Sequence, residues 1–168
     1  MALNTYLSKV VGEKQGAFKG GVIQKGREGW IEIIQSSHQI VSPRDPASGQ
    51  ATGKRSHKPI RLSFYYDQSL PAWYQALVYN ESLKEVVIAY FSPNKLGTAG
   101  GAGVETLTYE IKLTNAFVST IEFSMPNNKN PELMKYENTA TIEMVYQKIE
   151  GTWKLGNKVW QDDWLAPT

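Results

Sequence analysis

The sequence predicts a mainly β protein, an antiparallel barrel or sandwich with one short α-helix and one long extended loop. Three observations lead to this fold class. About six or seven segments show the two-residue alternation or the short apolar run of a strand. Only one segment has the apolar spacing of a helix, and no strand-helix-strand rhythm of the kind that builds parallel sheets is present.

Length and composition favour a single domain over residues 1–168. The chain has 168 residues, of which 41% are hydrophobic, enough for one well-buried core. Its 18 basic and 16 acidic residues leave a net charge of +2, so no overall field favours nucleic acid or an anionic membrane as a partner. The absence of cysteine excludes disulfides, thiol catalysis and cysteine-ligated zinc.

The sequence contains neither a secretory signal nor a membrane-spanning run. The first residues, MALNTYLSKVVGEK, lack the basic segment and the apolar stretch of a signal peptide. No apolar run approaches the roughly 18 residues of a membrane span. We therefore expect synthesis and folding in the cytoplasm, no membrane insertion, and export only by a route that accepts folded protein.

The first part of the chain is expected to hold strands separated by turns. Residues 3–11 form a strand candidate with weak alternation, and the glycines of residues 12–29 favour turns over a helix. The run WIEIIQSSHQIV predicts a strand over residues 30–41, and IRLSFYY predicts another from Pro59 to Tyr66. The apolar face of this second strand is expected to carry Ile60, Leu62, Phe64 and Tyr66.

Between these two strands, residues 42–58 are predicted to form an unpaired loop. Pro43 and Pro46 lack the N–H that a sheet ladder needs, while Gly49 and Gly53 resist ordering. Most connections in compact domains have about 2 to 6 residues. A loop of this length is either functional or a sign that the flanking strands are wrongly assigned, and we favour function.

One helix is expected, from Leu70 to Tyr79. The side chain of Ser69 can accept a hydrogen bond from the first turn, and Pro71 lies where its missing N–H costs little. Asn80 is a suitable residue to end the helix. The apolar stripe that would dock on the sheet comprises Leu70, Trp73, Tyr74 and Leu77.

The second half is expected to contain three extended segments. Residues 86–91 are apolar on both faces, which predicts a strand covered on both sides. Residues 97–103, GTAGGAG, resemble a phosphate-binding loop only superficially, because a strand rather than a helix follows, and we predict a hairpin turn. Residues 105–124 form the longest strand, in which Asn115 interrupts the alternation and indicates a bend or bulge. Its predicted apolar face carries Leu107, Tyr109, Ile111, Leu113, Phe117, Ile121 and Phe123.

The last strand predicted from the pattern begins at Ala140 and shows a slip. Even-numbered residues are apolar up to Tyr146, but Lys148 then falls on the apolar parity and Ile149 on the polar one, which a bulge would explain. The tail from residue 151 onward has no clear period.

No candidate for catalysis or metal binding is well supported. His38 and His57 lack a third ligand at a defined spacing, so we expect them to be satisfied structurally. Asp162 and Asp163 are neighbours on the chain and are expected to diverge rather than face one pocket. The basic residues of 54–58 stand alone, without the basic stripe or aromatic platform of a nucleic-acid site. We predict no enzyme activity, no cofactor and no metal.

The tryptophans of the tail are the remaining candidates for an interface. Trp160 and Trp164 lie where little apparent core exists, and large exposed aromatics usually meet a pocket or a partner. The tail either folds over its own barrel or packs on a neighbouring molecule, and the sequence leaves both open. A carbohydrate platform is a weaker third option.

Several strings in the chain are specific enough to be compared with known families. The most specific lies in residues 42–59, SPRDPASGQATGKRSHKP. Others are GEKQG at 12–16, QKGRE at 24–28, LTNA at 113–116, and DDW with AP between 162 and 167. Together these strings resemble the haemolysin-coregulated protein (Hcp) family of type VI secretion tube subunits. The resemblance covers nearly the whole chain in order, and it implies a small antiparallel β-barrel.

The resemblance implies a structural role. Such a subunit forms a homohexameric ring that stacks head to tail into a tube, propelled by a contractile sheath, capped by a valine-glycine repeat spike protein and able to carry effectors in its lumen. The chain would be secreted by this system without a signal peptide. The loop that would set ring stacking contains Ser42, Pro43, Arg44, Asp45, Ser48, Gly49, Thr52, Gly53, Lys54, Arg55, His57 and Lys58. The polar face that would line the lumen, or else lie on an ordinary solvated surface, contains Thr106, Thr108, Glu110 and Lys112.

One departure and two alternatives remain. Where many relatives carry a Lys- and Glu-rich segment after the HKP motif, this chain has Phe64, Tyr65 and Tyr66, so the neighbouring interface or partner is expected to differ. The alternatives are a monomeric β-barrel module that holds a ligand or glycan with Trp160 and Trp164, and a phage tail-tube subunit.

Overall fold

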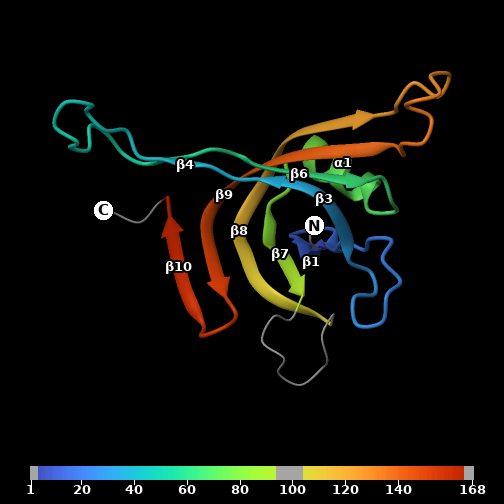
Figure 1. Cartoon of the computed structure of the whole chain (residues 1–168), viewed down its shortest axis with the longest axis horizontal. Coiled ribbons are helices and arrows are strands. Elements are labelled where there is room, and N and C mark those ends of the chain that lie inside the picture. Colours follow the sequence, from blue (N-terminus) through green and yellow to red (C-terminus); the bar gives the residue numbers. More distant parts are fainter. Residues whose placement is uncertain (1–3, 94–103, 165–168) are drawn as a thin grey trace.

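Six strands close into a β-barrel in the computed structural model, which describes residues 4–93 and 104–164 (Figure 1). Around the barrel the order is β9, β6, β3, β1, β7 and β8, and β8 pairs back with β9, each neighbour running antiparallel to the next. The closure favours the predicted barrel over the sandwich. The bounds are β1 Thr5–Gly12, β3 Ile31–Ser37, β6 Ile60–Tyr65, β7 Leu83–Pro93, β8 Glu105–Ser124 and β9 Thr139–Trp153.

The other described elements attach to this barrel. A short β2 (Gly16–Ala17) pairs with β1, and α1 (Leu70–Val78) packs against β8. The strands β4 (Ile40–Val41) and β5 (Ser56–His57) pair only with each other. Finally, β10 (Lys158–Asp163) pairs with the second half of β9, so the tail that showed no period is a strand.

The predicted strands match the observed ones most closely where alternation is strong. The long strand over 105–124 has the bounds of β8, and the strand predicted over 86–91 lies within β7. The segment 30–41 is divided into β3 and β4 rather than being one strand. The turn predicted over 97–103 lies outside the described residues. No helix in the described ranges, 4–93 and 104–164, is long and apolar enough to cross a membrane.

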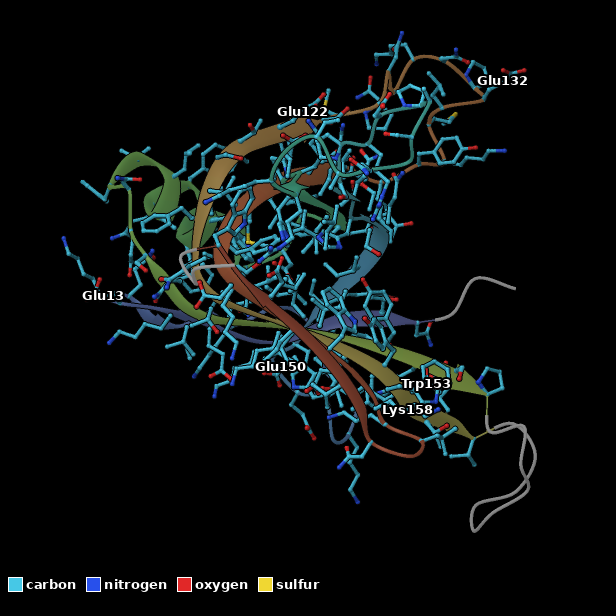
Figure 2. The ribbon with its side chains drawn as sticks, turned by 90° about the vertical axis from the view of Figure 1, so that its left-hand side faces the viewer. Glu13, Glu122, Glu132, Glu150, Trp153 and Lys158 are labelled. Carbon is cyan, nitrogen blue, oxygen red and sulfur yellow. The ribbon has the colours of Figure 1, made fainter. Side chains whose placement is uncertain are left out.

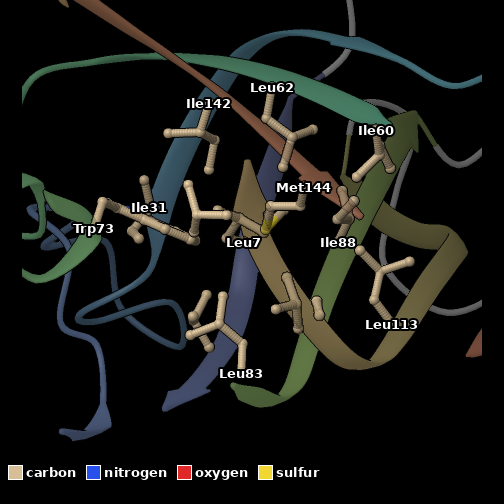
Figure 3. Packing of buried hydrophobic residues seen from close by; sticks show 14 of the residues in the cluster. Leu7, Ile31, Ile60, Leu62, Trp73, Leu83, Ile88, Leu113, Ile142 and Met144 are labelled. Carbon is tan, nitrogen blue, oxygen red and sulfur yellow. The ribbon is translucent and has the colours of Figure 1, made fainter. Parts of the chain in front are cut away.

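The barrel interior is filled by apolar side chains from every strand of the ring (Figure 3). Ile60, Leu62 and Phe64 of β6 have no exposed surface, as the alternation predicts, but Tyr66 lies beyond the strand and is exposed. The indole of Trp73 on α1 is fully buried and meets the rings of Phe18 and Phe64 at centroid distances of 5.1 and 6.3 Å. The helix therefore covers part of the core with one large side chain.

The structure corrects two predictions about α1. The side chain of Ser69 caps nothing. Instead its hydroxyl donates to Asp67 Oδ1 at 2.5 Å, and the same oxygen accepts from the Ser69 backbone N–H at 2.8 Å. Tyr74 is exposed, because the buried face of the helix runs through Trp73 and Ala76 and does not include Tyr74. The prediction favoured Tyr74 because its side chain is larger than that of Ala76. Asn80 does end the helix, with a left-handed φ of 49°.

The bend predicted in the longest strand is confirmed, and β9 bends with it. Asn115 has a left-handed φ of 50°. Buried residues fall on odd positions up to Leu113 and on even positions, Ala116 and Val118, after it. The prediction that Phe117 belongs to the buried face is therefore wrong, because this side chain is only partly buried. In β9 the buried parity changes at the same place, between residues 146 and 149, which confirms the predicted slip. Since both strands change together, their pairing register is kept across the bend.

Strand β7 is buried on both faces, as predicted. Val86 and Ile88 belong to the main core. On the other face, Ala89 and Phe91 form a second cluster with Tyr6 of β1. The guanidinium of Arg27 lies 3.8 Å from the centroid of the Phe91 ring and closes this cluster from outside.

Candidate functional site: a projecting arm and its anchor

The segment expected to be an unpaired loop is a projecting hairpin, which we call the arm and define as residues 39–58. Figure 1 shows it reaching away from the barrel beyond the label of β4. Ile40 pairs with His57 and Val41 with Ser56, and an isolated bridge joins Arg44 to Ala51 further out. The expectation that this segment cannot pair is therefore wrong.

The prolines do not prevent pairing, because no backbone N–H is needed at either position. The backbone N–H of Thr52 donates to the Pro43 carbonyl at 3.0 Å, and the Lys58 N–H donates to the Gln39 carbonyl at 2.9 Å. Pro46 falls in the turn at the tip, where no ladder bond is needed. The arm is thus a narrow two-stranded ribbon with its own backbone pairing.

Asp45 shapes the tip of the arm. One of its carboxylate oxygens accepts from the Ala47 backbone N–H at 3.1 Å, and the other accepts from the Ser48 hydroxyl at 2.6 Å. The hydrogen bond from Ser48, followed by the one from Ala47, lowers the pKa of Asp45. Gly49 completes the turn with a φ of 70°, and its carbonyl accepts from the Arg44 guanidinium at 3.0 Å. Asp45 therefore has a structural task within its own turn.

The surface of the arm is basic. Arg44, Lys54 and Lys58 are exposed, and Asp45 is the only acidic residue in residues 39–58. The other predicted loop residues that are exposed are Ser42, Pro43, Ser48, Gly49, Thr52 and Gly53. Arg55 and His57 differ from these because their side chains turn back to the body of the molecule.

A polar cluster, which we call the anchor, fixes the base of the arm; it comprises Arg55, His57, His38, Tyr146 and Asp162. The guanidinium of Arg55 donates two hydrogen bonds to the two carboxylate oxygens of Asp162. His57 Nε2 lies 2.6 Å from Asp162 Oδ2, and His57 Nδ1 lies 2.9 Å from the Tyr146 hydroxyl. His38 Nε2 lies 2.6 Å from the same hydroxyl. The anchor thus joins the arm to β9 and β10.

The electrostatics of the anchor favour an ionised Asp162 and a protonated Tyr146. The hydrogen bond from Arg55 is the main reason that the pKa of Asp162 is lowered, and the hydrogen bond from His57 adds to it against the effect of burial. Burial raises the pKa of the Tyr146 hydroxyl, and the charge of Asp162 raises it further. A hydroxyl has one proton, so Tyr146 donates to one imidazole and accepts from the other.

The histidines of the anchor are held by contacts within the chain. The side chain of His57 is only 2% exposed, and both of its ring nitrogens are engaged within the chain. The expectation that His38 and His57 are satisfied structurally is confirmed. In the described part of the chain, no three His, Asp or Glu side chains gather as metal ligands.

The described part of the tail packs on its own chain, as in the first of the two possibilities that the sequence left open. Trp160 donates from Nε1 to the Tyr109 hydroxyl at 2.8 Å and lies over Gly151, where a Cβ would collide with both groups. Trp164 stacks against His57 with ring centroids 4.8 Å apart. The two indoles still expose 39% and 44% of their surface. Figure 2 shows Trp153 and Lys158 at the turn where β9 leads into β10.

The predicted polar face lies on the outside of β8, opposite the barrel core. Thr108 donates to the Tyr90 carbonyl at 3.1 Å, and Thr106 donates to the Ser92 carbonyl at 3.3 Å. The ion pairs are Glu110 with Lys154 at 3.2 Å and Lys112 with Glu85 at 3.3 Å. All four predicted residues therefore form part of one polar sheet surface across β7, β8 and the end of β9.

Comparison with known proteins agrees with the fold and the sequence motifs. The family described as "Type VI secretion system effector, Hcp" matches residues 9–153. The Major exported protein of Pseudomonas aeruginosa is 29% identical over 176 residues, covering 99% of this chain and 98% of that protein. A crystal structure of an Hcp protein has a TM-score of 0.84 at 27% identity, covering 97% of this chain and 100% of that one. The Hcp1 protein from E. coli EAEC 042 has a TM-score of 0.80 at 27% identity, covering 97% and 99%. The chain belongs to the Hcp family of type VI secretion system proteins.

Proposed function

We propose that the chain is the structural subunit of a type VI secretion inner tube, forming hexameric rings that stack head to tail and can carry effectors in the lumen. Family membership supports a role in type VI secretion, and Hcp is a family of structural, secreted tube proteins rather than of enzymes. The observation that carries the proposal is the arm, a paired ribbon with an exposed basic surface and a partly buried polar anchor. A segment fixed only at its base and directed away from the barrel is suited to reach a neighbouring molecule.

Different residues of the arm have different roles in the proposed stacking. Arg44, Lys54 and Lys58 present exposed cations to the next ring, where they set orientation and association rate. Asp45 holds the tip turn. Arg55 and His57 hold the base in place, which lowers the ordering entropy that a flexible loop would lose on binding.

The closed barrel suits a ring subunit. Closure leaves few free sheet edges, which limits uncontrolled strand addition. A ring with one contact repeated around it must be head to tail, so one side of each barrel fits the opposite side of its neighbour. The free edge of β10, with the exposed faces of Trp160 and Trp164, is our candidate for one of these sides.

The polar face of Thr106, Thr108, Glu110 and Lys112 is our candidate for the wall of the lumen. Its ion pairs make a hydrated surface of mixed charge, over which cargo can pass without adhering strongly. The partners that follow are a second copy of the chain, effectors, a contractile sheath and a valine-glycine repeat spike protein. We infer synthesis in the cytoplasm and secretion by this system, in line with the name of the exported relative.

Electron microscopy of the purified protein tests the proposal. The wild type is expected to show six-fold rings, with short stacks at high protein concentration. The double variant Arg44→Glu/Lys54→Glu is expected to keep the rings and lose the stacks, because it changes only exposed arm cations. The control Lys84→Glu/Lys129→Glu makes the same change in charge at two exposed lysines outside both the arm and β10 and is expected to keep rings and stacks. Absence of rings in the wild type would contradict the proposal.

A further inference from the structure

A groove lies at the end of the molecule opposite the arm. Its volume is about 510 Å³, and it lies between the loop 21–24 and the chain that leaves β6. In Figure 1 these segments are on the right, near α1 and the start of β3, whereas the arm extends to the left. The residues that give the groove its chemistry are Ile23, Glu32, Tyr65, Tyr66, Asp67 and Glu137.

The walls of the groove are fixed by hydrogen bonds. Asp67 Oδ2 accepts from the Gly21 backbone N–H at 2.8 Å, and Gln68 Nε2 donates to the Gly20 carbonyl at 2.5 Å. Gly20 packs so closely on the Trp30 carbonyl that no Cβ fits there. The Tyr66 backbone N–H donates to the Asn138 carbonyl at 3.3 Å, which joins the chain that leaves β6 to the end of the β8–β9 hairpin. The groove therefore exists before any partner binds.

The lining of the groove favours a cationic side chain. It contains three carboxylates and no lysine or arginine. Asp67 is used in the wall, but Glu32 and Glu137 form no ion pair with any residue of the described ranges. The exposed rings of Tyr65 and Tyr66 border them. Carboxylates beside tyrosine faces attract lysine and arginine by charge and by cation–π contact.

The arm provides the cations that this groove lacks. Arg44 and Lys54 are exposed at one end of the molecule, and Glu32 and Glu137 are exposed at the other. Two complementary patches at opposite ends cannot satisfy each other within one chain, and between copies they give a repeating head-to-tail contact. The aromatic replacement noted after the HKP motif is part of this groove, since Tyr65 and Tyr66 line it while Phe64 is buried in the core.

We propose that the arm of one copy docks in the groove of the next, with Arg44 and Lys54 meeting Glu32 and Glu137 beside Tyr65 and Tyr66. This inference rests on the proposed stacking of rings and names its acceptor surface. It makes Tyr65 and Tyr66 specificity residues for the partner ring, so that a mixed stack with a subunit lacking them is disfavoured.

Disulfide trapping tests the contact directly, because the chain has no cysteine of its own. Ser48→Cys is placed at the tip of the arm and Ile23→Cys in the groove, where Ile23 is 92% exposed. The two proteins are purified separately, one with an affinity tag, mixed under mild oxidation and separated without reductant. We expect a mixed dimer of Ser48→Cys with Ile23→Cys. The control is Leu155→Cys, 54% exposed at the turn between β9 and β10, which is expected to form little mixed dimer with Ser48→Cys.

A charge exchange shows whether the named residues make the contact. Adding Arg44→Glu/Lys54→Glu to the arm protein, or Glu32→Lys/Glu137→Lys to the groove protein, is expected to lower the yield of mixed dimer about tenfold. Combining the reversed arm with the reversed groove is expected to restore the yield, which neither misfolding nor a change in net charge would do.

The outcomes separate this contact from the ring itself. If the protein is a hexamer but Ser48→Cys links to Leu155→Cys as readily as to Ile23→Cys, the groove is not the acceptor. The same conclusion follows if Ser48→Cys links to neither. In both cases the hexameric ring is still supported. Failure of the reversed pair to recover above the single reversals also overturns it. A monomer that still gives the charge-dependent mixed dimer supports the arm–groove contact while refuting the hexamer.

Discussion

The hydroxyl of Tyr146 joins the arm, β9 and the turn after β3. It lies within hydrogen-bond distance of ring nitrogens on both His38 and His57. Removing it leaves two buried or half-buried nitrogens without a partner, which costs more than the loss of a solvated hydrogen bond. The geometry of the arm therefore depends on a residue that lies in the barrel and not in the arm.

Tyr146→Phe is expected to lower the free energy of unfolding by about 1 to 3 kcal/mol, because it removes the hydroxyl with almost no change in volume. Urea denaturation followed by tryptophan fluorescence measures the change. The control Tyr79→Phe removes an exposed hydroxyl and is expected to stay within about 0.5 kcal/mol of the wild type. Equal effects of the two substitutions would show that the hydroxyl does not stabilise the anchor.

The anchor also predicts a loss of stability in acid. Burial, and next the charge of His57, lowers the pKa of His38. A base with a lowered pKa in the folded state stabilises the protein above its unfolded pKa, about 6.5, and loses that contribution as the pH falls through the folded value. The lowered pKa of Asp162 acts in the same direction at a lower pH, below about 4.

We therefore expect the urea midpoint to fall between pH 7 and pH 5 and to fall again below pH 4. His38→Gln keeps a hydrogen-bonding side chain that does not titrate, so the first fall should become smaller while the second remains. The groups near His38 that titrate or carry charge are unchanged in this variant. They are His57, Tyr146, Asp162 and Arg55 of the anchor, and Lys58, Arg61 and Glu143 in the hollow beside His38. An unchanged slope between pH 7 and pH 5 in His38→Gln would contradict the assignment.

For single residues, the sequence predicted whether a side chain has a structural role but not which side chains it contacts. The structural role of His38 and His57 followed from the absence of a third ligand. Their contact with Tyr146 spans 108 and 89 positions of the chain, and Arg55 meets Asp162 across 107. No local pattern links residues so far apart. The one available signal was the parity of Tyr146 in its strand, which marks it as a polar-tipped side chain on a buried face.

Among the elements, the joint bend of β8 and β9 determines how the barrel closes. Asn115 takes a left-handed φ of 50°, and its side-chain amide donates to Gln147 Oε1 at 2.9 Å on the neighbouring strand. Beyond this point β9 leaves β6 and takes β10 as its neighbour. The bend thus separates the closed barrel from the hairpin that supports the anchor.

Asn115→Val is expected to cost about 1 to 3 kcal/mol, because a β-branched residue does not readily adopt this φ. Asn115→Gly loses the same amide but accepts the backbone conformation, so it should cost less than about 1 kcal/mol. Thermal denaturation of the two variants side by side measures the difference. If glycine and valine destabilise equally, the amide contact and not the backbone conformation would be the important feature.

Alternation predicted β6 and β8 well, and an apolar run predicted the centre of β7, because each of these strands buries at least one face. It failed for the arm, whose pairing depends on backbone groups and not on buried side chains, so its composition resembles that of a loop. It also failed for β10, in which every residue is at least partly exposed. The sequence also could not show that the Ser69 hydroxyl donates its hydrogen bond to Asp67 instead of capping the helix.

In the molecule as a whole, barrel closure requires β9 to pair with β8 along its whole length, from Thr139 to Trp153, and also to pair with β6. The strand pattern allowed a barrel or a sandwich, since order around a sheet is not encoded in local periodicity; only the family resemblance indicated the barrel. The arm is basic and the groove acidic, and the segments that form them lie at opposite ends of the molecule, a placement that emerges only in three dimensions (Figure 1).

The proposed assembly is a closed ring of six chains, and the absolute mass of the protein in solution tests it. Light scattering behind size exclusion is expected to give six times the 18.8 kDa of the chain, both for the wild type and for Arg44→Glu/Lys54→Glu, with only the larger stacks missing in the variant. A mass of 18.8 kDa at every practical concentration would contradict the ring.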